Sequence, residues 1–223
     1  MKKYDILYRN VILYGFFRRY ALKIVTLKNE KCFASNCYLL IFDDSFSVVD
    51  PSVTYEDAKR EVPEIESLKP EYVLLTHGHL DHIWGIDSYV KVGCEVLVSY
   101  DDGKMLSDKY LNCAVFLRGD IYSYNGDYRI VCDGEKIKAG NTIFEVIATP
   151  GHTKGSLCFL TDGILFSGDT LFAGGSFGRY DLPTGNFEDL RNSLYKLLSL
   201  PDDLCIYSGH GEITTMKTNK SFF

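Results

Sequence analysis

Residues 74–85 read LLTHGHLDHIWG and hold three of the five histidines in a chain of 223 residues. His77, His79, Asp81 and His82 all fall within six residues, directly after an apolar run. Imidazole and carboxylate groups are good ligands for zinc, and also for iron and manganese. A polar turn after a buried strand would explain one such side chain, but four potential ligands this close together predict a metal site.

The spacing within this stretch would allow it to serve two metal ions. His77 and His79 are two residues apart and point the same way if the backbone is extended. Asp81 and His82 follow where a helix is expected to begin, so they point elsewhere. One short segment can therefore serve two metals at the spacing of ~3.5–4 Å found in two-metal hydrolases. The remaining ligands, including a bridging carboxylate, must come from distant loops.

Three such loops follow other apolar runs. His152 lies in ATPGHTKGS, Asp169 in FSGDT and His210 in YSGHGE, so every histidine lies in a glycine-containing loop after an apolar run. Taken alone, His152 or His210 would more often be a hydrogen-bonded loop residue, and Asp169 a turn or cap residue. Loops at one edge of a sheet can aim their side chains into a common cleft. We therefore expect these three residues to complete the site.

The composition is that of a globular chain long enough to bury one ordinary core, with 46% hydrophobic and 24% charged residues. Its net charge of −6 argues against nucleic acid or an anionic membrane as a partner. The first 21 residues are unlike an export signal because Asp5, Arg9 and Asn10 interrupt their apolar core. No stretch approaches the ~18 apolar residues that span a bilayer, so we expect no membrane association. The sequence does not indicate an oligomeric state.

The cysteines predict a reducing compartment. There are seven of them, an odd number, with no CxxC pair, and most lie beside apolar residues, as in SNCYLL and SLCFL. Buried thiols in the cytoplasm explain this pattern better than a disulfide framework does. They are Cys32, Cys37, Cys94, Cys113, Cys132, Cys158 and Cys205.

Short apolar runs ended by glycine, aspartate or proline predict a layered α/β domain. NCYLLIF and FSVVD predict two paired strands around the DDS turn, and EYVLL predicts a buried strand leading into the histidine cluster. NFEDLRNSLYKLLSLP predicts the clearest helix, capped by Asn186 or Thr184 and ended by Pro201. Residues 101–127, rich in tyrosine and turn formers, give no clear element and are expected to cover a site.

Four motifs carry a family resemblance. THGHLDH, TPGHTKGS, LFSGDTLF and YSGHGE resemble, in order and spacing, the motifs of the metallo-β-lactamase superfamily, and most closely those of its glyoxalase II-like (hydroxyacylglutathione hydrolase-like) members. The resemblance implies an α/β fold, an αββα sandwich of two mixed β-sheets flanked by helices, with metals in a cleft at the sheet edges. It covers residues 21–223 as a single domain and leaves residues 1–20 as an N-terminal extension.

The resemblance also implies a role for each candidate residue. Two divalent metal ions are expected, most readily zinc, with iron or manganese as alternatives. A water shared by the two metals would lose a proton and attack an ester or thioester carbonyl, and Asp81 would orient it. The implied ligands are His77, His79 and His152 for the first metal, Asp81, His82 and His210 for the second, and Asp169 as the bridge.

Departures from the family pattern narrow the expected activity. Metallo-β-lactamases proper commonly have cysteine at the position of Asp169, so antibiotic hydrolysis is not expected. The diiron oxygen reductases have glutamate at the position of His79, so this activity is not expected either. The chain ends thirteen residues after His210, so the helical domain that grips glutathione in classical glyoxalase II is not expected. Arg179, in SFGRYDLPTG, takes the place of a family lysine and is expected to contact a substrate carboxylate or amide. A surface salt bridge to Asp181 or Asp189 is the alternative.

These observations favour hydrolysis of a small thioester or ester, such as a hydroxyacyl-glutathione. A persulfide dioxygenase that uses one iron on the same scaffold is the first alternative. A metal-dependent phosphodiesterase or ribonuclease is disfavoured by the acidic charge. A non-catalytic binding module would not need so complete a set of metal ligands.

Overall fold

The computed structural model describes residues 11–14, 22–29, 34–116 and 122–223 as two mixed β-sheets packed face to face. The first sheet runs antiparallel from β1 to β4 and parallel from β4 to β7, in sequence order. Its strands are β1 (Val11–Tyr14), β2 (Leu22–Asn29), β3 (Ser35–Ile41), β4 (Ser45–Val49), β5 (Lys69–Leu74), β6 (Glu95–Val98) and β7 (Arg129–Ile130).

The second sheet has the order β13-β12-β11-β10-β9-β8, and only its β11–β12 pair is parallel. Its strands are β8 (Lys136–Ala139), β9 (Thr142–Ala148), β10 (Leu157–Thr161), β11 (Ile164–Gly168), β12 (Cys205–Ser208) and β13 (Thr214–Thr215).

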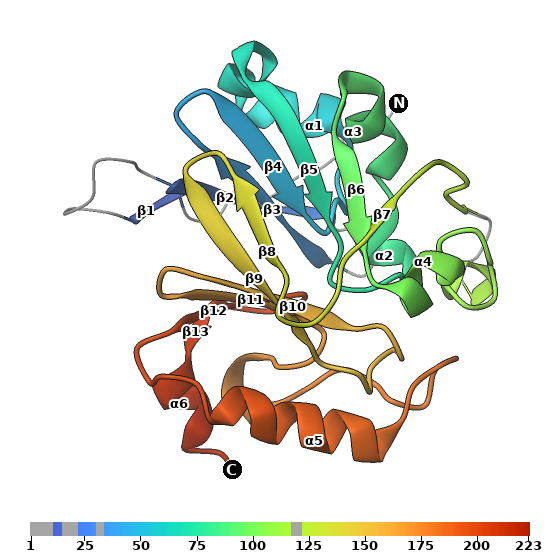
Figure 1. Cartoon of the computed structure of the whole chain (residues 1–223), viewed down its shortest axis with the longest axis vertical. Coiled ribbons are helices and arrows are strands. Elements are labelled where there is room, and N and C mark those ends of the chain that lie inside the picture. Colours follow the sequence, from blue (N-terminus) through green and yellow to red (C-terminus); the bar gives the residue numbers. More distant parts are fainter. Residues whose placement is uncertain (1–10, 15–21, 30–33, 117–121) are drawn as a thin grey trace.

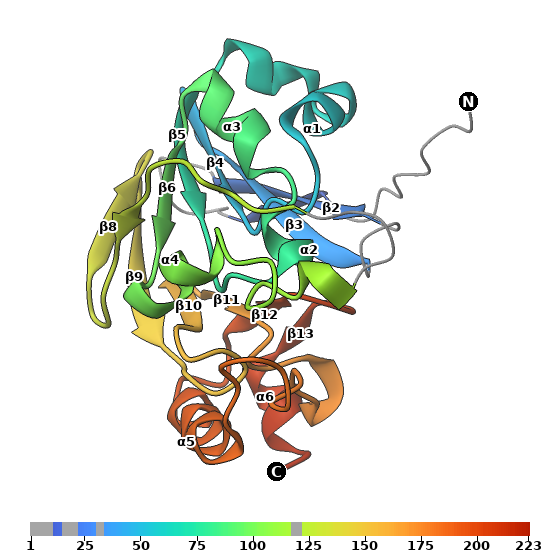
Figure 2. The same ribbon diagram turned by 90° about the vertical axis from the view of Figure 1, so that its right-hand side faces the viewer.

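Helices cover the outer face of each sheet. Figure 1 shows α1 and α3 at one end of the molecule and α5 and α6 at the other, with both sheets between them, and Figure 2 shows the same layers from the side. The α-helices are α1 (Tyr55–Glu61), α2 (Leu80–Ile83), α3 (Ile86–Val92), α4 (Tyr100–Met105), α5 (Phe187–Leu198) and α6 (Met216–Lys220), and the 3-10 turns are η1 (Pro63–Ser67), η2 (Ala114–Phe116) and η3 (Ala173–Gly175). The predicted αββα sandwich is confirmed.

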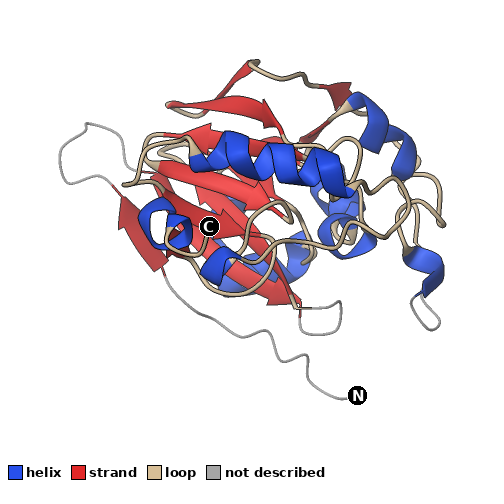
Figure 3. Cartoon of the chain, turned by 90° about the horizontal axis from the view of Figure 1, so that it is seen from below, coloured by secondary structure: helices blue, strands red, loops and turns tan. Residues whose placement is uncertain are grey.

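Three apolar clusters hold the four layers together. The central cluster lies between the sheets, where Tyr38 of β3 meets Phe166 and Tyr207 of the second sheet. A second cluster packs the first sheet against α1 and α3. The third packs Leu190, Leu194 and Leu197 of α5 against the second sheet, across which α5 lies in Figure 3. Each helix therefore buries one apolar face and each sheet buries two, which fixes the order of the layers.

The predicted strands and the long helix form where the sequence places them. The pair around the DDS turn is β3 and β4, and EYVLL lies in and just after β5, which leads into the histidine cluster. Asn186, rather than Thr184, caps α5 by accepting a hydrogen bond from the Asp189 backbone N–H. Residues 101–127 contain most of α4 and the η2 turn.

The N-terminal segment contributes one edge strand, because β1 pairs with β2. The rest of residues 1–20 lies outside the described residues, so the division into an extension and a domain at residues 21–223 stays a prediction. Within the part of the chain that the structure describes, no helix has the length and apolar character needed to cross a membrane.

Candidate metal centre

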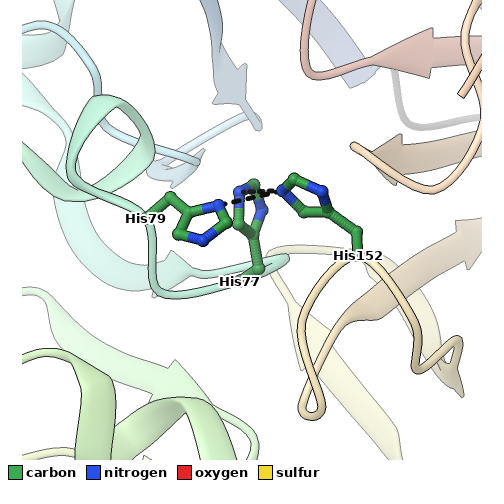
Figure 4. A group of neighbouring side chains, drawn as sticks. All are labelled: His77, His79 and His152. Atoms are coloured by element: carbon green, nitrogen blue, oxygen red, sulfur yellow. Dashed lines mark hydrogen bonds between the residues drawn. The ribbon is translucent and has the colours of Figure 1, made fainter. Parts of the chain in front are cut away.

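The first cluster consists of three buried histidines from two loops. His79 Nδ1 lies 2.9 Å from His152 Nε2, which in turn lies 3.3 Å from His77 Nε2 (Figure 4). Ligand atoms of a tetrahedral zinc ion, each bonded at 2.0–2.1 Å, are about 3.3 Å apart. The three ring nitrogens are therefore spaced as ligands of one ion.

Local structure explains why these nitrogens converge. The loop after β5 carries His77 and His79, and the loop between β9 and β10 carries His152. His79 is the N-cap residue of α2, but its side chain makes no capping hydrogen bond, so the ring turns into the site instead.

The second cluster consists of Asp81, His82 and His210. The Nε2 atoms of His82 and His210 lie 3.3 Å apart, and Asp81 Oδ2 lies 3.5 Å from the first and 3.2 Å from the second. Asp81 and His82 belong to α2, whereas His210 follows β12 in the other sheet. This cluster therefore connects segments that follow strands of the two sheets, and its ligand atoms are spaced similarly to those of the first, at 3.2–3.5 Å.

Asp169, just after β11, lies between the two clusters. Its Oδ2 is 3.5 Å from His152 Nε2, and its Oδ1 is 3.5 Å from His82 Nε2. One carboxylate thus faces both sets of ligands. Gly209 makes room for it, because a Cβ at that position would lie 2.1 Å from Asp169 Oδ1.

These donors fit a pair of divalent cations. Asp169 Oδ1 is buried and receives no hydrogen bond within the described residues. Buried lone pairs that converge without a donor between them are unfavourable unless a cation neutralises them. The two clusters and the shared carboxylate therefore suit a dinuclear site of nitrogen and oxygen ligands.

Burial keeps the first cluster uncharged. Desolvation, followed by repulsion from the neighbouring histidines, lowers the pKa of His77 well below its ordinary value. The same causes lower the pKa of His79, although Asp81 opposes them. Burial also lowers the pKa of His152, against the attraction of Asp169. The three rings are therefore in the form that binds a metal.

The second cluster behaves in the opposite way. Burial alone would lower the pKa of His82, but Asp81, Asp169 and Asp50 outweigh it and raise this pKa to about 10. The pKa of His210 is raised by its hydrogen bond to Asp81, against burial. Burial would raise the pKa of Asp81, but His82 and His210 hold it below its ordinary range. At neutral pH His82 therefore holds a proton when no metal is bound.

Hydrogen bonds from outside the clusters orient the rings. Thr76 Oγ1 lies 3.0 Å from His77 Nδ1, Asp50 Oδ2 lies 3.0 Å from His82 Nδ1, and the Arg179 carbonyl oxygen lies 2.6 Å from His152 Nδ1. Each contact leaves the Nε2 atom of its ring facing the site.

Asp50 is not among the residues predicted from the sequence, although it ends the predicted strand FSVVD much as Asp169 follows the apolar run ILFSG. The apolar run before Asp50 was the signal, but no glycine lies beside Asp50 as Gly168 lies beside Asp169. The structure adds that Asp50 is buried and accepts the backbone N–H and the hydroxyl hydrogen of Thr76 as well.

A second buried carboxylate was also missed. Asp102, on α4, accepts hydrogen bonds from the backbone N–H groups of Gly78 and Gly155 and from the Thr153 hydroxyl. Burial raises the pKa of Asp102 to about 6, against these three donors, which lower it. Asp102 falls in the stretch for which the sequence predicted no clear element.

The two clusters open into a cavity of about 890 Å³. Its walls beyond the ligands are largely apolar and include Tyr110, Phe116, Phe172 and Phe177. Arg179 and Asp181 also line the cavity. Arg179 Nε and Nη2 donate hydrogen bonds to the two Asp181 carboxylate oxygens, each at 2.8 Å. The salt bridge to Asp181 that the sequence offered as the alternative for Arg179 is thus present, and it lies in the cavity wall.

Comparison with known proteins agrees with this geometry. The family model described as the metallo-beta-lactamase superfamily matches residues 31–210. The hydroxyacylglutathione hydrolase GloC of Haemophilus influenzae is 35% identical over 195 residues, which cover 84% of this chain and 91% of that protein.

Two similar solved structures share the fold. The BLEG-1 B3 metallo-beta-lactamase is 31% identical with a TM-score of 0.76, and the match covers 85% of this chain and 92% of that one. The di-iron-bound form of TTHA1623 is 26% identical with a TM-score of 0.73, and the match covers 94% of this chain and 96% of that one.

Proposed function

Since the chain belongs to the metallo-beta-lactamase superfamily, we propose that it is a dinuclear metal-dependent hydrolase acting on a small thioester or ester. One observation carries the proposal. Two sets of ligand atoms lie at metal-binding distances on either side of the Asp169 carboxylate, beside a cavity of about 890 Å³.

In this proposal each cluster holds one divalent ion, with zinc as the first candidate and iron or manganese as alternatives. Bound together, two such ions lower the pKa of a water molecule and polarise a carbonyl group. The chain supplies His77, His79 and His152 on one side, Asp81, His82 and His210 on the other, and Asp169 between them.

Asp81 has a second task beyond holding a metal. Its side chain is partly exposed and lines the cavity, whereas the His82 side chain is fully buried behind it. A carboxylate in this place can accept a hydrogen bond from the attacking water and fix its direction toward the carbonyl carbon. Asp81 is therefore the proposed catalytic residue.

Arg179 is the proposed substrate-binding residue. Its side chain is 68% exposed, lines the cavity and is held in place by Asp181. A guanidinium group that is already oriented loses little freedom when it binds a carboxylate or amide oxygen of the substrate.

The thioester is favoured by the similarity to GloC, whose name states that it hydrolyses hydroxyacylglutathione. A thiolate is also a better leaving group than an alkoxide. We propose in addition that the protein works in the cytoplasm, since the buried cysteines Cys37, Cys94 and Cys158 are free thiols.

The test measures metal content and activity on the same preparation. We expect about two metal equivalents per chain by elemental analysis, together with hydrolysis of lactoyl-glutathione or a simple aryl thioester. A chromogenic β-lactam belongs in the assay because BLEG-1 is a B3 metallo-beta-lactamase. A result of one iron per chain, with oxygen uptake on glutathione persulfide and no thioesterase activity, would reject the hydrolase proposal and favour the persulfide dioxygenase.

A further inference from the structure

Asp102 lies outside both metal clusters, yet it contacts both loops that form the first one. Its side chain is fully buried on α4. The Asp102 backbone N–H donates to the Ser99 hydroxyl, which caps this helix. The carboxylate therefore has a fixed position from which it can hold other segments.

One loop is tied to Asp102 between its two histidines. The Gly78 backbone N–H donates to Asp102 Oδ2 at 2.9 Å, and Gly78 stands between His77 and His79. A Cβ at Gly78 would lie 3.0 Å from the Asp102 carbonyl oxygen, so this loop is pressed against α4. The bond fixes the backbone from which both rings project.

The other loop is tied to the same carboxylate just after its histidine. The Thr153 hydroxyl donates to Asp102 Oδ2 at 2.7 Å, and the Gly155 backbone N–H donates to Asp102 Oδ1 at 2.9 Å. A Cβ at Gly155 would lie 2.5 Å from Oδ1, so only glycine allows this approach. The backbone beside His152 is thereby set relative to that beside His77 and His79.

Other residues anchor the distant ligand of the second cluster. The loop with His210 is held by Asn36, whose backbone N–H donates to the Gly209 carbonyl at 2.7 Å, and by Tyr38, whose hydroxyl donates to the Ser208 carbonyl at 2.5 Å. The distant ligand of the second cluster is therefore held by bonds that do not involve Asp102.

We propose that Asp102 is a positioning residue that locks the two loops of the first cluster together and thereby sets the metal affinity of that cluster. The inference rests on the proposed metal-binding function. It predicts that Asp102 matters for the ion held by His77, His79 and His152 and has little effect on the other.

The substitution Asp102→Asn makes a sharp test because the amide has the same shape as the carboxylate. If the new side-chain carbonyl oxygen accepts from Gly78 and Thr153, the NH₂ group must face the Gly155 N–H, donor against donor. With the amide turned round, the NH₂ group faces Gly78 and Thr153 instead. Neither arrangement keeps all the bonds, so one loop is released.

The experiment measures Zn²⁺ affinity by competition with a chromophoric chelator, with one cluster disabled at a time. In a His210→Ala background we expect Asp102→Asn to weaken binding about 10–100-fold, the usual cost of losing an outer-sphere partner. In a His152→Ala background we expect a loss of about threefold or less, because the second cluster has its own anchors. No catalytic activity is needed for either measurement.

Two controls separate positioning from general damage. Asp101→Asn changes the neighbouring carboxylate on the same helix, which pairs with Lys154 at 3.2 Å, and should leave both affinities unchanged. If Asp102→Asn does not fold, Thr153→Val removes one of the three donors and should weaken the first cluster. Thr153→Ser keeps the hydroxyl group and should leave the Zn²⁺ affinity of the first cluster close to that of the wild type.

The outcomes are distinguishable from failure of the proposed function. A wild-type chain that binds no metal would reject the metal centre itself. A wild-type chain that binds two ions while Asp102→Asn weakens both clusters equally, or neither, would overturn the role of Asp102 alone.

Discussion

Asp169 is the residue on which the two clusters depend together. Its two oxygens face His82 on one side and His152 on the other, each at 3.5 Å. The sequence could propose it as a bridge only through the resemblance to a family, because an aspartate after a strand more often serves a turn. The distances to both clusters give that proposal a physical basis.

Asp169→Ala should lower metal content and activity together. Loss of a ligand common to both ions should reduce the rate by more than the ~10–100-fold that loss of an outer partner costs. Elemental analysis and thioester hydrolysis on the same sample measure both effects. Asp203→Ala, at an exposed aspartate before β12, is the matched control. Unchanged metal content in Asp169→Ala would show that the bridge is wrongly assigned.

The opposite pKa shifts of the two clusters predict different pH dependences of metal binding. The pKa values of His77 and His79 lie well below 6.5, so above pH 7 a metal displaces no proton from them. The pKa of His82 is raised to about 10, so a metal must displace its proton at any pH below that value. Affinity for the second ion should therefore rise about tenfold per pH unit for each displaced proton between pH 7 and 9, while the first stays nearly constant.

Calorimetric titration with Zn²⁺ in two buffers of different ionisation enthalpy measures the released protons directly. The His210→Ala and His152→Ala variants separate the two clusters, and their comparison is the internal control. Equal proton release from both clusters would contradict the conclusion that His82 is protonated before the metal binds and that His77 and His79 are neutral.

At the scale of elements, α5 could be read from the sequence and α4 could not. The α5 sequence has twelve residues with an apolar face and a capping asparagine, and these signals are local. The α4 sequence has only six residues. Its Asp102 carboxylate is buried because two loops from elsewhere in the chain pack over it and donate hydrogen bonds to it. Sequence periodicity carries no information about such partners.

The segment that follows α4 should decide which acyl groups are accepted. Tyr110 and Phe116 are 59% and 58% exposed, line the cavity and have ring centroids 6.0 Å apart. Replacing both by alanine should raise KM about tenfold for a thioester with an aryl or long alkyl group, because ~1–1.5 kcal/mol of apolar contact is lost. The kcat should not change, since neither side chain belongs to the metal clusters.

Steady-state kinetics on paired substrates, one with an aryl group and one with a lactoyl group, provide the measurement. Tyr195→Ala, at a tyrosine of α5 that is 63% exposed and does not line the cavity, serves as control. An equal rise in KM for both substrates would mean that the two aromatic rings do not select the acyl group.

At the scale of the whole molecule, the packing of the sheets creates the metal centre. His82 lies on α2, which follows β5 of the first sheet, and His210 lies after β12 of the second sheet. They are 128 residues apart in the chain, yet their Nε2 atoms lie 3.3 Å apart. The backbone N–H of Leu157 in the second sheet also donates to the Thr76 carbonyl after β5, at 2.7 Å. The packing of one sheet against the other therefore positions the backbone beside His77 directly.

Phe166→Ala tests this support. The ring is fully buried between the sheets, 5.4 Å from the rings of Tyr38 and Tyr207, so its removal should lower the free energy of unfolding by about 3–5 kcal/mol. Denaturant unfolding of the metal-free protein measures the loss. Phe187→Ala, at a phenylalanine that is 44% exposed, should cost much less. Similar losses for the two variants would show that the core between the sheets is not the main source of stability.

The sequence by itself determined the chemistry of the site and the strands that lead into it. Histidines and aspartates in glycine-containing loops after apolar runs are short-range patterns. They predicted seven candidate ligands, and the structure brings these seven side chains together. Only the tertiary structure decided which atoms face one another, that Asp50 and Asp102 support the rings and loops, and that Arg179 is paired with Asp181. The reason is physical: such contacts arise where two sheets and their loops pack together, and no local periodicity encodes that approach.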